Sequence, residues 1–108
     1  MDGEYVVALI TAPSKDVGER IARALVENKL AACVNLVAPM RSVYAWEGKT
    51  CDEEEVLLVA KTTLAAFEGG FVPLVSSLHP YQVPEIIALP IVRGSRGYLE
   101  WIERATRA

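Results

Sequence analysis

The stretch Arg41-Ser42-Val43-Tyr44-Ala45-Trp46-Glu47-Gly48-Lys49 lies near the middle of a chain of 108 residues. From Arg41 to Trp46, odd-numbered side chains face one way and even-numbered side chains the other, because successive strand residues point to opposite faces of a sheet. Glu47-Gly48-Lys49 supplies a turn, and residues 53–62 return as a second strand with an apolar centre at residues 56–60. The stretch therefore predicts a β-hairpin that joins two halves of the chain.

The half before the hairpin predicts a strand, a helix and a long strand. Residues 5–11 are a continuous apolar run, as in a strand that is buried on both faces. Ser14 can cap an amphipathic helix that ends near Asn28-Lys29. Residues 32–46 are rich in β-forming side chains, and Pro39 among them predicts a bend or bulge.

The half after the hairpin predicts a helix, a strand and a last helix. Apolar residues recur at helical spacing over residues 64–78, but Gly69-Gly70 and Pro73 interrupt them. We therefore expect a helix that is broken or starts late, with Pro73 in its first turn. Residues 85–92 form the last strand, and Gly94-Ser95 opens a terminal helix whose Trp101 is expected in the core.

The resulting order is β-α-β-β-α-β plus a C-terminal helix. Two β-α-β units joined by a hairpin form one antiparallel sheet of four strands with helices on one face, which is the ferredoxin-like arrangement of the α+β class. The predicted strands carry apolar residues on both faces, so the face without helices also needs cover. A symmetric oligomer is the simplest cover.

Composition is typical of a folded protein with a single domain over residues 1–108. Hydrophobic residues make up 52% and charged residues 23%. The formal net charge of −3, without a block rich in Lys and Arg, argues against a nucleic-acid partner. No apolar run approaches the ~20 residues of a membrane span, and Asp2 and Glu4 stand where a signal peptide is basic. We therefore predict a cytoplasmic protein with no membrane partner.

The sequence lacks the patterns of common enzymes. It shows neither a Ser-His-Asp nor a Cys-His arrangement with supporting motifs, and no phosphate-cradling glycine-rich loop follows a predicted strand. The acidic run of residues 52–55 is predicted to be a solvated flank of the hairpin. We therefore expect a protein that binds or scaffolds and does not catalyse a reaction.

The single histidine lies in an unusual run, His79-Pro80-Tyr81-Gln82-Val83-Pro84-Glu85. Each proline fixes its own φ at roughly −65° and steers the residue before it to an extended conformation. The run is therefore a stiff connector between the broken helix and the last strand. Because a binding site works best when its side chains are held in place before the ligand arrives, this connector is the strongest lead to function.

Several segments of characteristic composition follow one another along the chain. They are Thr11-Ala12-Pro13, Leu30-Ala31-Ala32-Cys33-Val34-Asn35, Ser42-Val43-Tyr44-Ala45-Trp46-Glu47-Gly48-Lys49, Lys61-Thr62, His79-Pro80-Tyr81-Gln82-Val83-Pro84-Glu85 and Ile87-Ala88-Leu89-Pro90. In this order they resemble the CutA family of divalent-cation tolerance proteins over essentially the whole chain.

The resemblance implies a ferredoxin-like homotrimer whose sheets pack around the threefold axis, similar in shape to the PII signalling proteins. It also implies an association with copper and other divalent metals, without an established enzymatic reaction. The resemblance implies no required cofactor, and it makes copper(II) or another divalent metal a candidate ligand.

His79 and Glu85 are the candidate metal ligands. A neutral imidazole binds Cu(II), Zn(II) or Ni(II), but a tight site needs three or four ligands, so Glu85 or a carboxylate of another subunit has to contribute. Family members with proposed copper ligands can carry a Cys before Thr-Ala-Pro and a second His before His-Pro-Tyr; here those positions hold Ile10 and Leu78. The alternative is a histidine that only forms hydrogen bonds within a subunit interface.

A second constellation consists of Tyr44, Trp46, Lys61 and Tyr81, which the resemblance places with His79 and Glu85 near a cleft between subunits. Aromatic walls, a cation and a carboxylate can hold a small anionic or zwitterionic molecule. The same side chains can equally be interface packing, because Tyr and Trp are enriched at interfaces.

Two functions therefore remain open. The first is a trimer of the divalent-cation tolerance family that acts by metal binding or as a scaffold. The alternative is a PII-like sensor of a small metabolite at the cleft between subunits. RNA binding on the sheet is disfavoured, because the net charge is negative and the sheet is expected to be buried.

Overall fold

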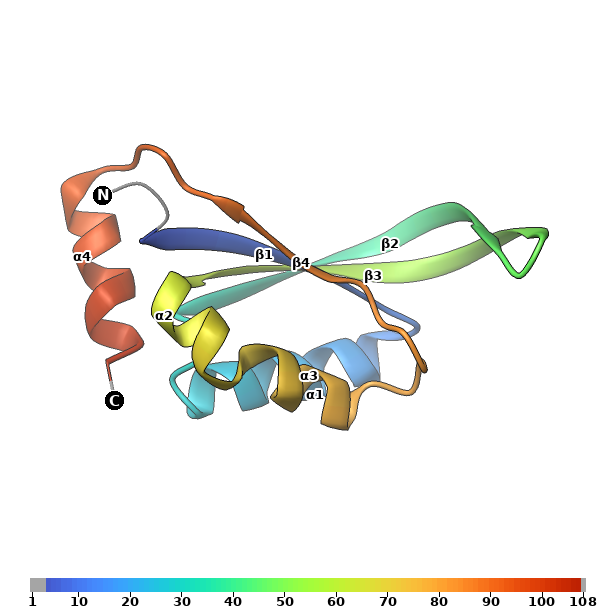
Figure 1. Cartoon of the computed structure of the whole chain (residues 1–108), viewed down its shortest axis with the longest axis horizontal. Coiled ribbons are helices and arrows are strands. Elements are labelled where there is room, and N and C mark those ends of the chain that lie inside the picture. The colour runs from blue at the N-terminus through green and yellow to red at the C-terminus, as the bar shows by residue number, and fades with distance from the viewer. Residues whose placement is uncertain (1–3, 108) are drawn as a thin grey trace.

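The computed structural model describes residues 4–107. The elements follow in the order β1 (Tyr5–Ala12), α1 (Lys15–Glu27), β2 (Cys33–Trp46), β3 (Lys49–Thr63), α2 (Leu64–Ala66), η1 (Phe67–Phe71), α3 (Val72–Leu78), β4 (Ile86–Pro90) and α4 (Arg96–Ala105). The predicted succession of strands and helices is confirmed, including the central hairpin (Figure 1).

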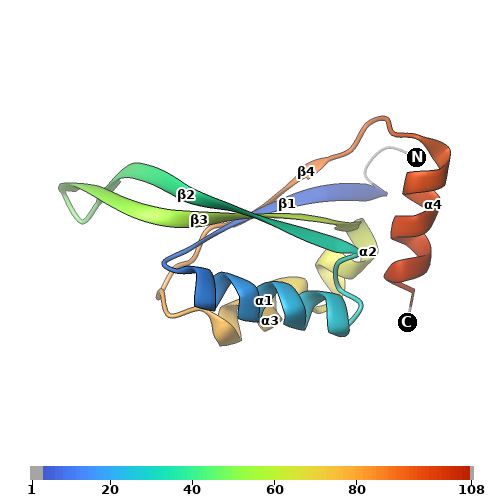
Figure 2. The ribbon, with the colours of Figure 1, turned by 180° about the vertical axis from the view of Figure 1, so that it is seen from behind.

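The strands form one antiparallel sheet of the α+β class, as predicted, in the order β2-β3-β1-β4. Helices α1 and α3 lie together on one face, and α4 stands across one end of the sheet (Figures 1 and 2). The hairpin of β2 and β3 extends beyond the helices at the other end. The molecule is therefore elongated, with principal extents of 43 × 25 × 22 Å.

The core lies between the sheet and the helices, and alternation along β1 and β3 creates it. Even-numbered residues of β1 are buried and odd-numbered residues are half-buried. Ile10 of β1 pairs with Leu58 of β3, and both are fully buried among Ile21 and Leu25 of α1. The apolar run of residues 5–11 predicts burial on both faces, whereas in this single chain only the helical face is closed.

Local sequence signals explain where α1 begins and how closely it packs. The hydroxyl of Ser14 accepts a hydrogen bond from the backbone N–H of Val17 at 3.2 Å, which confirms the predicted cap. At Gly18, a Cβ atom would lie only 3.2 Å from Cδ1 of Leu58 and 3.3 Å from Cδ2 of Leu36. Glycine therefore lets the helix backbone approach the sheet.

The hairpin has the predicted bend and turn. The pairing of β2 with β3 shifts register between Val37 and Met40, where Pro39 cannot donate a ladder hydrogen bond. The turn uses Glu47 at φ 51° and Gly48 at φ 78°. Such positive φ values suit glycine, and two in succession match the right-handed twist of the flanking strands.

The second helical region is broken, as predicted. It consists of α2, the π-helical turn η1 and α3, and the backbone leaves helical geometry at Gly70, where φ is 149°. Pro73 lies in the first turn of α3, where its missing N–H has no helical partner to lose. The break lets Phe71 and Val75 both reach the core.

One core prediction is wrong. Trp101 of α4 is 38% exposed, and its ring lies 5.4 Å from that of Tyr98 on the helix surface. Ile102 is the residue of α4 that is fully buried. Because neighbouring positions on a helix point about 100° apart, a short helix that touches the sheet along one narrow stripe buries Ile102 and leaves Trp101 outside.

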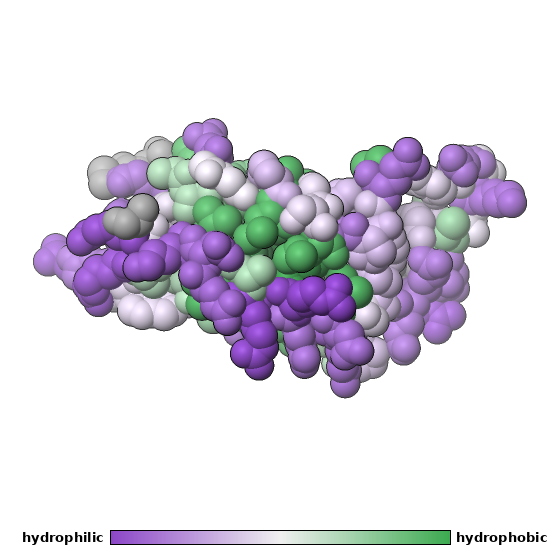
Figure 3. All heavy atoms as spheres, turned by 90° about the horizontal axis from the view of Figure 1, so that it is seen from below, coloured by the Kyte–Doolittle hydropathy of each residue, from purple (hydrophilic) through white to green (hydrophobic). Residues whose placement is uncertain are grey.

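The outer surface is mostly hydrophilic around an apolar centre when the molecule is viewed from its helical side (Figure 3).

Among residues 4–107, no helix is long and apolar enough to cross a membrane. The fold therefore concentrates its burial between one face of the sheet and the helices that cover it.

We expect Leu58→Ala to lower the free energy of unfolding by about 2–5 kcal/mol, because it empties space in the centre of the core. The matched control is Leu64→Ala in α2, where the side chain is partly exposed and the loss should be clearly smaller. Denaturant unfolding at equal protein concentration measures both values. Equal losses in the two variants would contradict this assignment of the core.

Candidate functional site

A cavity of about 650 Å³ lies where the hairpin meets the connector between α3 and β4. Its volume is in the range of small-molecule sites. Its lining residues come from the end of β1, the two hairpin strands and the connector; they are Thr11, Arg41, Ser42, Val43, Tyr44, Trp46, Glu55, Tyr81, Gln82, Val83 and Glu85. The structure therefore brings together Tyr44, Trp46, Tyr81 and Glu85 from the predicted site.

His79 anchors the connector to β1. The side chain is buried, and its Nε2 lies 2.7 Å from the carbonyl oxygen of Thr11. Its Nδ1 accepts a hydrogen bond of 3.2 Å from the backbone N–H of Tyr81. Because a carbonyl can only accept, this pattern fits the tautomer with the proton on Nε2. A metal ion at His79 would have to replace one of these two partners.

Tyr81 and Glu55 tie the connector to the hairpin. The hydroxyl of Tyr81 donates to Oε2 of Glu55 at 2.8 Å, and only 5% of Glu55 is exposed. The pKa of Tyr81 is raised, first because burial disfavours the phenolate and second because Glu55 accepts the phenolic hydrogen. The contact therefore holds a neutral phenol against a buried carboxyl group.

Two aromatic side chains of β2 form the wall that faces the connector. Tyr44 donates its hydroxyl to Oε1 of Glu53, and this hydrogen bond is the main reason why the pKa of Tyr44 is raised. Trp46 lies at the end of β2 and is 46% exposed. The wall thus offers aromatic surface next to the carboxyl groups of β3.

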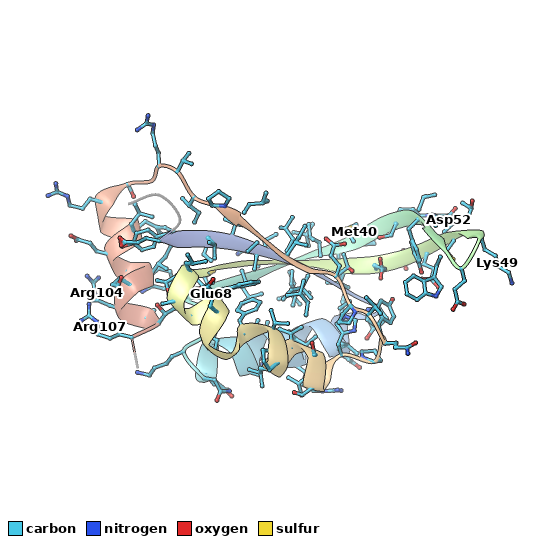
Figure 4. All side chains as sticks on the ribbon, in the orientation of Figure 1. Met40, Lys49, Asp52, Glu68, Arg104 and Arg107 are labelled. Atoms are coloured by element: carbon cyan, nitrogen blue, oxygen red, sulfur yellow. The ribbon has the colours of Figure 1, made fainter. Side chains whose placement is uncertain are left out.

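The guanidinium at the cavity rim is already paired. Arg41 donates to Asp52 through Nε at 2.6 Å and through Nη2 at 3.2 Å. Asp52 lies in the outer part of the hairpin with Lys49 at its tip, while Met40 is nearer to the body of the molecule (Figure 4). The pair is exposed, so it adds little to stability, but it neutralises the cation at the rim.

Lys61 does not reach this cavity within one chain. Its Nζ contacts Oδ1 of Asn35, and it pairs with Cys33 at the other end of the sheet. Tyr44 pairs with Cys51, and the ten residues from Cys51 to Lys61 span roughly 33 Å of strand. The number of residues between them, multiplied by the rise per residue of a strand, shows from the sequence that Lys61 lies far from the aromatic residues.

Glu55 is a charged cavity residue whose burial the sequence does not predict. The acidic run of residues 52–55 is exposed up to Glu54, but Glu55 is buried, so the prediction of a solvated flank is wrong for this residue. Its position directly before the buried Val56 is a weak signal. Its hydrogen-bond partner, Tyr81, is 26 residues away in sequence.

Comparison with known proteins assigns the family. The family model described as CutA1 divalent ion tolerance protein matches residues 6–105. The chain belongs to the CutA1 family. This confirms the resemblance that the ordered segments indicate.

Relatives of this CutA1 chain occur in bacteria and eukaryotes. The divalent-cation tolerance protein CutA of Thermus thermophilus is 51% identical over 100 residues, which cover 93% of this chain and 96% of the relative. Protein CutA of Homo sapiens is 42% identical over 106 residues, which cover 98% of this chain but 59% of the human protein.

Solved CutA1 structures share the fold. The divalent cation tolerance protein of Thermus thermophilus matches with a TM-score of 0.92 and 50% identity, covering 95% of this chain and 99% of the other. CutA1 of a psychrotrophic Shewanella species matches with a TM-score of 0.93 and 38% identity, and each chain is covered completely.

Metal-donor side chains are dispersed in the part of this CutA1 chain that the structure describes. Among residues 4–107, no group of three or more His, Cys, Asp or Glu side chains is placed to hold a metal ion. Ile10 is fully buried in the core, and Leu78 packs against that core at the end of α3. Neither of these two side chains can donate to a metal ion.

We expect Tyr81→Phe to lower the free energy of unfolding by about 1–3 kcal/mol at neutral pH, because Glu55 loses its hydrogen-bond donor. In the wild type, stability should also fall as the pH rises above ~10, because the unfolded tyrosine releases its proton there while folded Tyr81 keeps it. The variant should show a shallower alkaline decline. Urea unfolding across this pH range measures both effects.

The control for this experiment is Tyr98→Phe on α4, where the side chain is 43% exposed. At neutral pH it should change the free energy of unfolding by no more than about 0.5 kcal/mol. If Tyr81→Phe were as stable as this control, the Tyr81–Glu55 contact would not hold the connector.

Proposed function

We propose that this CutA1 protein acts as a homotrimer that binds divalent metal ions, copper(II) among them, and serves as a scaffold without catalysing a reaction. The family match carries the proposal, since relatives from Thermus thermophilus and Salmonella newport bear the name divalent-cation tolerance protein. The proposed compartment is the cytoplasm. The net charge of −3 supports a role with neither nucleic acid nor membrane as partner.

The open face of the sheet supports the trimer. Leu89 of β4 is 51% exposed, and Val7, Leu9 and Val59 form a half-covered apolar surface beside it through the strand pairings. Contiguous apolar surface of this kind is usually closed by another protein surface. A PII-like, ferredoxin-like homotrimer that packs these faces around a threefold axis would close it with copies of the chain itself.

His79 and Glu85 are the proposed metal ligands. Nδ1 of His79 is the nitrogen with the longer hydrogen bond, 3.2 Å against 2.7 Å at Nε2, so it is the donor that a metal would recruit. Glu85 is exposed and lines the cavity. Further donors would come from a neighbouring subunit, which makes metal binding depend on assembly.

A second candidate function is the sensing of a small molecule at the cavity, as in PII-like proteins. The observation that favours it is the aromatic wall of Tyr44 and Trp46 facing the connector across about 650 Å³. A stiff connector beside a projecting hairpin suits a site whose occupation alters a surface for a partner.

Light scattering at micromolar concentration should give a mass three times that of the 11.8 kDa chain. Leu89→Asp should reduce this mass, because a carboxylate would be buried between the open faces. The matched control is Leu64→Asp, which places the same change in α2 and should leave the mass unchanged. A wild-type protein of monomer mass would contradict the architecture.

Calorimetric titration of copper(II) and zinc(II) into the metal-free protein tests the ligands. We expect saturable binding with a fixed number of ions per trimer, lost in His79→Ala and weakened in Glu85→Gln. Glu85→Gln is isosteric at an exposed position, so it keeps the test valid if His79→Ala loosens the connector. Unchanged binding in variants of trimer mass would exclude these two residues as ligands.

A further inference from the structure

The cavity contains a buried carboxyl group without a cationic partner. Glu55 is 5% exposed and accepts a hydrogen bond at Oε2 from Tyr81. Among residues 4–107, the ion pair that forms is Arg41 with Asp52, and no Lys, Arg or His pairs with Glu55. A buried carboxylate without a positive charge beside it costs free energy. A ligand that supplies a positive charge would recover that cost.

Within one chain, the other acidic side chains near the cavity add negative charge, and its lining cation Arg41 is already paired. Glu85 lines the connector side, and Glu53 lies behind the hydroxyl of Tyr44. The guanidinium of Arg41 is taken by Asp52 through two hydrogen bonds, and Lys61 lies at the other end of the sheet. Within one chain, the charge around the cavity therefore favours a cationic ligand over the anionic ligand that the presence of Lys61 in the sequence suggests.

The walls of the cavity are aromatic. Tyr44 and Trp46 present ring surface to it and stay partly exposed. Aromatic faces attract organic cations, and Trp does so most strongly. A hydrated metal ion gains little from such walls, whereas the hydrocarbon part of an organic cation can pack on them.

We infer that this cavity binds a protonated organic amine, with its ammonium group at Glu55 and its hydrocarbon part against Tyr44 and Trp46. An amine is preferred to a quaternary ammonium ion because its N–H groups can donate to Oε1 of Glu55, while Tyr81 donates to Oε2. This inference rests on the second candidate function and names the ligand class for that site.

Three probes distinguish the contribution of the charge to affinity from that of the aromatic ring. They share a benzyl or phenyl group and are benzylammonium, benzyl alcohol and benzoate. NMR titration of the intact protein at neutral pH should give a Kd for benzylammonium of ~1 mM, as expected for so small a ligand. Benzyl alcohol should bind about tenfold more weakly, because it lacks the charge-assisted hydrogen bond. Benzoate should not bind.

The decisive variant is Glu55→Gln, which keeps the shape and the acceptor for Tyr81 but removes the charge. This variant should bind benzylammonium about tenfold more weakly than the wild type and should no longer prefer it to benzyl alcohol. The matched control is Glu68→Gln beside α2, at the end of the molecule away from the hairpin tip, which should leave binding unchanged (Figure 4). Trp46→Ala changes an exposed position and should also weaken the binding of benzylammonium. It keeps the inference testable even if Glu55→Gln folds poorly.

Each remaining outcome overturns a defined part of the inference. If benzoate binds in preference to benzylammonium, the ligand class is wrong, but a small-molecule site at the cavity still holds. If none of the probes shifts the resonances of cavity residues, both the amine inference and the small-molecule function fail. Equal benzylammonium affinity in the wild type and Glu55→Gln would show binding that does not use the buried carboxyl group.

Discussion

The constraint on which the structure depends is the alternation of buried side chains along the two central strands. Ile10 and Leu58 face each other across the β1–β3 pairing, and both are closed off by α1. A slip of one residue would turn both toward the open face. β1 ends at Ala12, which pairs with Val56, while β2 and β3 are longer, so the outer part of the hairpin projects beyond the helices (Figure 1).

The connector uses that geometry to build the cavity. His79 holds it to the carbonyl of Thr11, and Tyr81 holds it to Glu55 on the hairpin. The residues that shape the cavity are thus positioned by hydrogen bonds within the chain and by two prolines. Both ligands proposed for this region, a divalent metal and an organic amine, are cations. Either would neutralise negative charge that Glu55 and Glu85 bring to it.

Much of the fold could be predicted because its signals are local. Ser14 caps α1, Pro39 marks the bulge, and Gly70 breaks the second helical region through properties of their own side chains or backbone. The errors concern contacts between distant residues. Trp101 is apolar yet lies on the uncovered side of α4, and Glu55 is acidic yet buried by Tyr81.

The sequence by itself determined the order of strands and helices, the family and the stiffness of the connector, since periodicity, caps, prolines and ordered motifs act over a few residues. Only the tertiary structure decided which charges share the cavity. Lys61 and Glu55 lie on the same strand, but their six-residue separation is roughly 20 Å, so one chain places the acid at the cavity and the base far from it. The buried Glu55 has its hydrogen-bond partner 26 residues away, which no local pattern records.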